Sequence, residues 1–146
     1  MAQVENDTTR LLAECDAGTL MAVTSIKDVI DRTDSMELHR LLGESLTTHE
    51  KLGDDIHALL KEYHLPAKEP SAMASVMSKM KVGMKMMQEN SDHTIADLMI
   101  DGCNMGIKSL SEYINQYPAA DQKAKDMAKR LVDAEQALAD ELRLYL

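Results

Sequence analysis

Two thiols, one imidazole and one carboxylate are spread over four apolar segments of the sequence, and together they could bind a metal ion. These residues are Cys15, His49, Cys103 and Glu135. Each falls on the apolar stripe of a predicted helix. At 1.5 Å per residue, all four lie about 16–24 Å from a common end. Thiolate, imidazole and carboxylate ligands suit zinc, or copper with methionine close by.

A structural polar layer is the interpretation that we prefer for the same four residues. Buried thiols often behave as small hydrophobic groups. A buried imidazole often pairs with a carboxylate or a hydroxyl, and Glu135, Thr19 and Ser45 are the candidate partners of His49. Such a pair would fix the register of two helices, although burying its charges costs free energy.

The sequence lacks the short motifs that mark common catalytic sites. There is no Gly-x-Ser-x-Gly, no phosphate-binding glycine loop, no Cys-x-x-Cys and no His-Glu-x-x-His. A ferritin-type di-iron centre needs a Glu from each of two helices and a Glu-x-x-His from each of the other two. The predicted last helix contains no histidine, and Leu46 stands three residues before His49. We therefore expect no catalytic residues, no resident cofactor and no di-iron centre. The expected function is binding or self-assembly, with zinc or copper binding as the alternative.

Residues 71–90 concentrate methionine and lysine in an otherwise acidic chain. The methionines recur at steps of four and three, which places five thioethers on one stripe of a helix with the lysines turned away. The residues are Met73, Met77, Met80, Met84 and Met87 on the stripe, and Lys79, Lys81 and Lys85 off it. Core filling is the simplest role; the alternatives are a Cu(I) ladder, a partner helix or a membrane surface. An exposed apolar stripe would also favour a homodimer or another homo-oligomer.

Composition indicates one globular domain, 1–146. Apolar residues make up 45% of the 146 residues, with no Phe or Trp, so the core must be built from aliphatic side chains and methionine. The net charge of −9 argues against a nucleic acid as the partner. The start, MAQVENDTTR, has no apolar run of the signal-peptide type, and no run is long enough to span a membrane. We therefore expect a cytoplasmic protein with reduced cysteines.

Apolar periodicity and capping residues predict five helices, at 7–31, 35–64, 72–89, 92–117 and 119–145. Asn6 or Asp7 would cap the first helix and Asp34 the second, while Pro118 would stand in the first turn of the last. The methionine helix would run back along the bundle between two helical hairpins. This order predicts an all-α, ferritin-like four-helix bundle with an additional crossover helix between helices 2 and 3.

Two stretches, KMKVGMKMM at 79–87 and IADLMIDGCNMGIKSLSEYINQY at 95–117, resemble a family of small, uncharacterised helical proteins of clostridia and related Firmicutes. The resemblance covers most of the chain, and its signatures are the Met/Gly/Lys-rich connector and Gly102-x-x-Met105-Gly106. More distantly, the chain is similar to ferritin- and rubrerythrin-like bundles. The resemblance implies the fold and no particular activity. Separately, Gly102 and Gly106 stand one turn apart at a cost in helix propensity, which predicts a close approach of helix backbones there.

Overall fold

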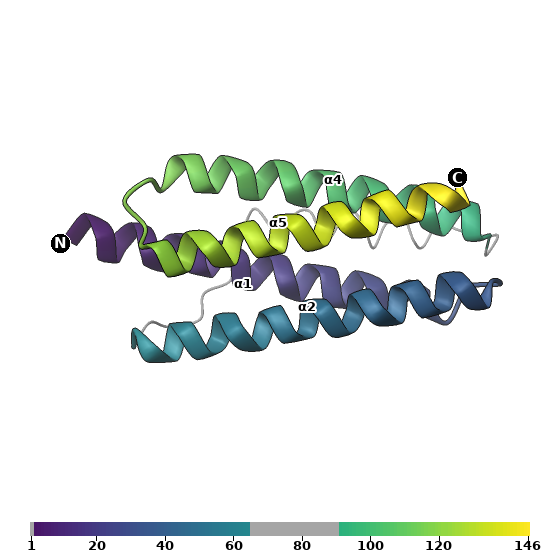
Figure 1. Cartoon of the computed structure of the whole chain (residues 1–146), viewed down its shortest axis with the longest axis horizontal. Coiled ribbons are helices and arrows are strands. Elements are labelled where there is room, and N and C mark those ends of the chain that lie inside the picture. Colours follow the sequence, from purple (N-terminus) through teal and green to yellow (C-terminus); the bar gives the residue numbers. More distant parts are fainter. Residues whose placement is uncertain (1, 65–90) are drawn as a thin grey trace.

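The structure is a computed structural model, and it describes residues 2–64 and 91–146. Every regular element within these residues is helical: α1 (Ala2–Ile30), α2 (Met36–Glu62), α4 (Asp92–Gln116), α5 (Gln122–Leu142) and a short 3₁₀ helix, η1 (Arg143–Tyr145). The four α-helices lie lengthwise beside one another (Figure 1). The predicted all-α helical bundle is thus confirmed for the described part of the chain. The predicted methionine helix, 72–89, lies outside the described residues, with its methionine stripe and its lysines.

Contacts at the two ends of the bundle define the direction of each helix. At one end, the Asp92 carboxylate accepts hydrogen bonds from the backbone N–H groups of Asp34 and Ser35, so α4 begins beside the turn between α1 and α2. At the other end, the Tyr63 hydroxyl donates to the Asp121 carboxylate, so α2 ends beside the turn between α4 and α5. α2 and α4 therefore run in the same direction, opposite to α1 and α5, as Figure 1 shows.

The helices form two hairpins, α1 with α2 and α4 with α5, which meet mainly through α2 with α5 and through α1 with both α4 and α5. Their buried side chains form two apolar clusters toward the two ends, one around Leu12 and Leu131 and the other around Ile26 and Leu142. Each fully buried large apolar side chain contributes about 1.5–3 kcal/mol. None of the helices in residues 2–64 and 91–146 is both long and apolar enough to cross a lipid bilayer.

The predicted apolar stripes are the faces that the helices bury. The stripe on α1 recurs at steps of three and four, and all its members are buried: Thr8, Leu12, Cys15, Thr19, Ala22, Ile26 and Val29. The stripe predicted for residues 35–64 has the same spacing, and only two of its members, Ser45 and Tyr63, are partly exposed. Its members are Leu38, Leu42, Ser45, His49, Leu52, Ile56, Leu59 and Tyr63. Helical periodicity therefore identified the core-facing sides correctly.

The first helix begins at Ala2 instead of residue 7, and neither Asn6 nor Asp7 caps it. Asp7 lies inside α1 and is only 3% exposed. Its carboxylate accepts hydrogen bonds from the Gln3 side chain at 2.6 Å and from the backbone N–H of Ala119 at 3.0 Å. Capping and long-range bracing use the same chemistry, a short carboxylate that accepts a backbone N–H bond, so the sequence alone does not distinguish them.

Ser35, rather than the predicted Asp34, is the N-cap of α2. Its backbone is extended (φ −83°, ψ 130°), as a cap requires, and its hydroxyl accepts a hydrogen bond from the backbone N–H of Leu38 at 3.3 Å. Ser91 caps α4 in the same way, by accepting from the N–H of Thr94 at 3.1 Å.

The last helix begins at Gln122, three residues later than predicted. Asp121 is its N-cap and accepts a hydrogen bond from the backbone N–H of Ala124 at 2.9 Å. Pro118 therefore lies in the turn and not in the first turn of the helix. The α-helix gives way to η1 after Leu142, short of the predicted residue 145. Four other helix boundaries differ from the prediction by one or two residues: the start at Met36 and the ends at Ile30, Glu62 and Gln116.

Candidate functional site

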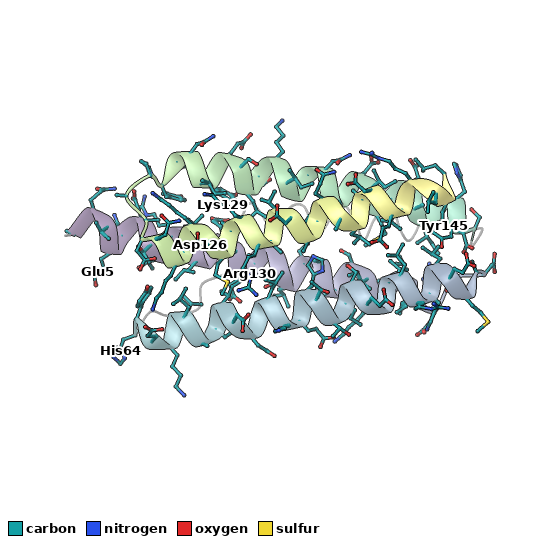
Figure 2. All side chains as sticks on the ribbon, in the orientation of Figure 1. Glu5, His64, Asp126, Lys129, Arg130 and Tyr145 are labelled. Atoms are coloured by element: carbon teal, nitrogen blue, oxygen red, sulfur yellow. The ribbon has the colours of Figure 1, made fainter. Side chains whose placement is uncertain are left out.

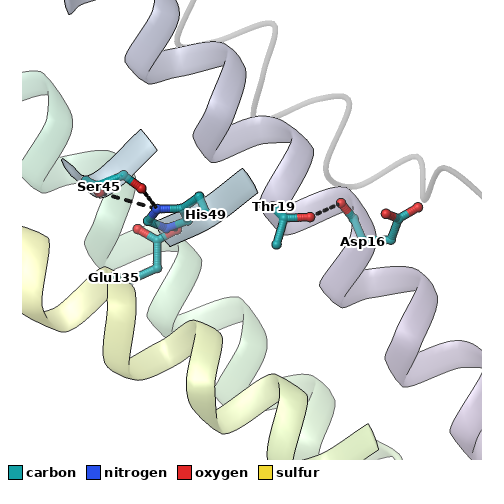
Figure 3. Close-up of polar contacts among 5 residues, drawn as sticks. All are labelled: Asp16, Thr19, Ser45, His49 and Glu135. Carbon is teal, nitrogen blue, oxygen red and sulfur yellow. Dashed lines mark hydrogen bonds and ion pairs between the residues drawn. The ribbon is translucent and has the colours of Figure 1, made fainter. Parts of the chain in front are cut away.

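His49 lies on the inner face of α2, and its side chain is fully buried. Its Nδ1 atom is 2.8 Å from the backbone carbonyl oxygen of Ser45, one helical turn earlier. Because a carbonyl oxygen can only accept, Nδ1 carries a hydrogen and donates it. The Ser45 hydroxyl oxygen lies 3.3 Å from the same nitrogen (Figure 3). These contacts fix the orientation of the ring and direct Nε2 toward α5.

Glu135, which is 5% exposed, is the α5 residue that faces His49. Its Oε1 atom lies 3.5 Å from His49 Nε2. The two atoms form an ion pair when His49 is protonated, and they do not form a well-aligned hydrogen bond, because Nε2 has no hydrogen-bond partner among the described residues. Glu135 also borders Gly106 of α4, where an added Cβ would lie 3.7 Å from the carboxylate. The space beside Gly106 thus faces a carboxylate, and among the described residues no neighbouring backbone makes the predicted close approach there.

Cys103 contacts the same carboxylate from a third helix, α4. Burial raises the pKa of the Cys103 thiol, and the negative charge of Glu135 and a hydrogen bond to it raise the pKa further. The thiol is therefore protonated at neutral pH and donates its hydrogen to Glu135. A cavity of about 20 Å³ borders both residues between α1, α4 and α5, with room for about one water molecule.

Opposing effects act on the protonation of His49. Burial lowers its pKa, because a buried site disfavours the charged imidazolium. The contact with the Glu135 carboxylate and the hydrogen bond to the Ser45 carbonyl raise the pKa, and the net direction is upward. Folding therefore shifts the protonation equilibrium of His49 toward the imidazolium, relative to a solvent-exposed histidine.

Cys15 does not join this group. It lies on α1 in the apolar cluster around Leu131, whereas Cys103 lies in the other cluster. Burial raises the pKa of Cys15 to about 12, with a further contribution from the charges of Glu14 and Asp16. In the part of the chain that the structure describes, no three or more His, Cys, Asp or Glu side chains are arranged to hold a metal ion. The structure thus brings together three of the four residues selected from the sequence and separates the fourth.

A groove of about 240 Å³ between α1 and α2 has His49 in its lining. The Thr19 hydroxyl donates to the backbone carbonyl of Asp16 at 2.8 Å (Figure 3), and the Asp16 carboxylate lies 2.6 Å from His57 Nε2. Gly53 leaves space beside Thr19, since an added Cβ would lie 3.5 Å from the Thr19 hydroxyl. Helical spacing places His57 away from the inner face of α2, and its side chain is 61% exposed. The sequence did not indicate Asp16 as the partner of His57, because this contact depends on how α1 and α2 are aligned.

Glu14 of α1 and Tyr113 of α4 form a further polar contact that the sequence did not indicate. Burial raises the pKa of Glu14, a rise that a hydrogen bond from Tyr113 partly offsets. The Glu14 Oε2 atom is buried without a hydrogen-bond partner among the described residues. Tyr113 stacks on Tyr117 with ring centroids 6.3 Å apart, and the Arg10 guanidinium lies 6.0 Å from the Tyr117 ring. The i, i+4 spacing of the two tyrosines was the available signal for their contact.

Comparison with known proteins adds evidence on the fold alone. No family model matches the sequence, and no curated protein matches it. Among solved structures, the chain is similar to the crystal structure of a DUF305 fragment from Deinococcus radiodurans. The two share 11% sequence identity at a TM-score of 0.73, over 94% of this chain and 93% of that one. At this identity, the likeness supports the helical architecture and carries no statement about activity.

Proposed function

We propose that the protein is a non-catalytic, ferritin-like helical bundle that acts by binding a partner or by self-assembly. The observation that most supports this proposal is the enclosure of its reactive side chains. His49, Cys103 and Glu135 converge inside the bundle, and the cavity beside Glu135 and Cys103 has room for about one water molecule. Ligand pockets of proteins are far larger, about 300–1,000 Å³. A substrate therefore has no room in the cavity beside Glu135 and Cys103, and the groove of about 240 Å³ between α1 and α2 has only His49 of these three residues in its lining.

The protonation of the thiols supports the same proposal. A cysteine nucleophile needs a lowered pKa, because the thiolate is the reactive form. Burial raises the pKa of both Cys15 and Cys103 instead. Both are free cysteines, so they act as buried thiols in the bundle.

Ferritin-like connectivity is the finer fold that we propose for the whole chain. α2 ends at one end of the bundle and α4 begins at the other. Two hairpins joined between opposite ends of a bundle are characteristic of ferritin-like folds, which contain one long crossover connection. The predicted helix at 72–89 would supply that connection.

A metal-binding protein is the second candidate. His49 Nε2 is buried without a hydrogen-bond partner among the described residues and lies 3.5 Å from Glu135 Oε1. Two ligand atoms at about 2.0–2.2 Å from one tetrahedral zinc ion are about 3.4 Å apart, so this separation suits a shared ion. Cys103, which contacts Glu135, would have to move to become the third ligand of zinc or copper, since no three such side chains among the described residues are arranged to hold a metal ion, and Cys15 lies in another cluster.

Two measurements on protein purified without chelator test the proposal. Light scattering over a range of concentrations should give an average mass above that of one chain, rising with concentration. Metal analysis should find no stoichiometric zinc or copper. A single-chain mass at every concentration, together with stoichiometric metal that is lost in Cys103→Ser, would reject self-assembly and favour the metal site.

A further inference from the structure

Two opposite sides of α1 are buried. Cys15 lies on the side that faces the core and is fully buried. Ala13 and Ala17 stand two residues before and after it, about 200° around the helix, so they lie on nearly the opposite side. Each alanine is nevertheless only 7% exposed, and neither belongs to the two apolar clusters of the bundle. A helix that is buried on two opposite sides has a neighbour on each of them.

The covered outer strip of α1 consists of Ala13, Ala17 and Met21, each one helical turn after the last. Steps of four residues advance about 40° around a helix, so the strip turns gradually toward α4. Met21, at its end, is 4% exposed and borders the small cavity that Gly102 of α4 also lines. Leu20, which lines the groove with α2, is 45% exposed. The strip therefore crosses the back of α1 away from α2 and toward α4.

The residues that join α2 to α4 have to travel the length of the bundle in the direction of α1. Figure 2 shows His64, which follows α2, and Tyr145, which packs in the same apolar cluster as Ile95 near the start of α4, at opposite ends. The Thr8 hydroxyl accepts a hydrogen bond from the backbone N–H of Asp121, beside which α2 ends. The early part of α1 is thus level with the end of α2.

The predicted helix at 72–89 fits the outer strip in length and in composition. From Thr8 to Ile30, α1 rises about 33 Å, whereas a helix over 72–89 rises about 27 Å and leaves the flanking residues to make the turns. Alanine side chains form a shallow surface, which long and flexible methionine side chains can fill. The five methionines on one stripe of the predicted helix supply such side chains.

Charge favours the same segment as the cover of the outer strip. Residues 65–90 contain four lysines and two glutamates, a net charge of +2, whereas the rest of the chain carries −11. Glu14 and Asp16 stand three residues from Ala17 and Ala13 respectively, about 60° to either side of the strip. Lysine stems can lie along an apolar surface while their amines reach carboxylates at its edges.

We propose that residues 72–89 form a helix docked on the outer strip of α1, running in the direction of α1 with the methionine stripe inward. This inference rests on the ferritin-like connectivity proposed above and names its docking surface. The methionines then belong to the core, and the lysine side is what this helix offers to a partner. Counting from the two ends places Met80 about level with the residues between Ala17 and Met21.

Trypsin digestion of the native protein, followed by mass spectrometry, is the first test. Docking protects the chain from cleavage after Lys79, Lys81 and Lys85. Ala17→Glu places a carboxylate against the thioethers, so the rate of cleavage after these lysines should rise about tenfold or more. Ala137→Glu, exposed on α5, is the matched control and should leave the rate unchanged. An unchanged rate in an Ala17→Glu protein of native helical content would overturn the proposal.

Disulfide formation in the full-length chain is the second test, and it decides alone if Ala17→Glu does not fold. Ala17→Cys is combined in separate chains with Met77→Cys, Met80→Cys or Met84→Cys, and each is treated with oxidised glutathione. Docking predicts an intrachain disulfide in at least one of these pairs, identified by peptide mapping. Ala17→Cys with Lys79→Cys, off the stripe, is the control and should form it at least about tenfold more slowly. No disulfide in the three pairs, or an equal rate in the control, would overturn the proposal.

Light scattering separates this inference from the proposed function. If a second copy covered the outer strip, the disulfides of Ala17→Cys would join two chains, and Ala17→Glu would lower the average mass. That result would overturn the docking and leave the proposed self-assembly intact. An intrachain disulfide in a protein of single-chain mass at every concentration would support the docking and reject self-assembly.

Discussion

Replacing His49 by Leu should destabilise the protein because it leaves the Glu135 carboxylate buried without its ionic partner. The His49 side chain is fully buried and that of Glu135 is 7% exposed, so water cannot replace the lost contact freely. Breaking a buried pair by removing one partner typically costs 3–5 kcal/mol. Glu135 keeps the Cys103 thiol and borders the small cavity, so we expect the low end, about 3 kcal/mol.

Urea unfolding followed by circular dichroism measures this change, and its pH dependence tests the cause. The pKa of His49 is raised in the folded state. The stabilisation from the pair is therefore complete below the unfolded pKa of about 6.5 and is lost as the pH rises through the higher folded value. The difference between wild type and His49→Leu should accordingly be larger near pH 6 than near pH 9.

Two further variants separate the ion pair from general effects of the substitution. His57→Leu, on the same helix but exposed, should change stability by less than about 1 kcal/mol. The double variant His49→Leu/Glu135→Met removes both charges and should recover most of the loss, since apolar replacement of a whole buried pair is often neutral. A His49→Leu protein as stable as the wild type at pH 6 would refute the reasoning.

Three other predictions follow from contacts in the bundle. Asp92→Ala removes two hydrogen bonds from the α1–α2 turn and should lower the free energy of unfolding in urea by about 2 kcal/mol. Asp97→Ala, exposed on the same helix, should change it by less than about 0.5 kcal/mol. Equal losses in the two variants would contradict a stabilising role of the Asp92 hydrogen bonds. Gly106→Ala adds a Cβ at ordinary contact distance from Glu135 and should stabilise α4 by up to about 1 kcal/mol, seen as a higher melting temperature; a lower one would mean that the site has no room. Both thiols should resist a maleimide reagent at pH 8 until urea unfolds the chain, because burial raises their pKa; rapid labelling of the native protein would show an accessible thiolate.

The sequence by itself determined the local features of this protein. Apolar steps of three and four identify which face of each helix is buried, because that periodicity depends only on helix geometry. The same reasoning placed His49 and Glu135 on inner faces and named Glu135 as one of three candidate partners of His49, with Thr19 and Ser45. It also placed the exposed His57 off the inner face of α2.

The tertiary structure decided which inner-face residues pack against one another. Counted from the contact between Asp7 and the α4–α5 turn, Cys15 lies about 12 Å along α1, while Cys103 lies about 21 Å from Tyr117 along α4. Counting from predicted helix ends had placed the two thiols within about 7 Å of each other along the bundle. The two offsets are similar, so the level along the bundle does not separate the thiols; their neighbours do, because Cys15 packs in the cluster around Leu131 and Cys103 in the cluster around Ile26 and Leu142.

The hydrogen bonds that Asp7 and Asp92 accept at the two ends of the bundle could likewise be identified only from the tertiary structure. Asp7 and Asp92 bind backbone N–H groups more than fifty residues away. Every non-proline residue carries an N–H group, so no residue type in the sequence marks the partner. Local periodicity therefore determined the faces of the helices. Contacts between distant segments determined their register, and with it which polar side chains meet.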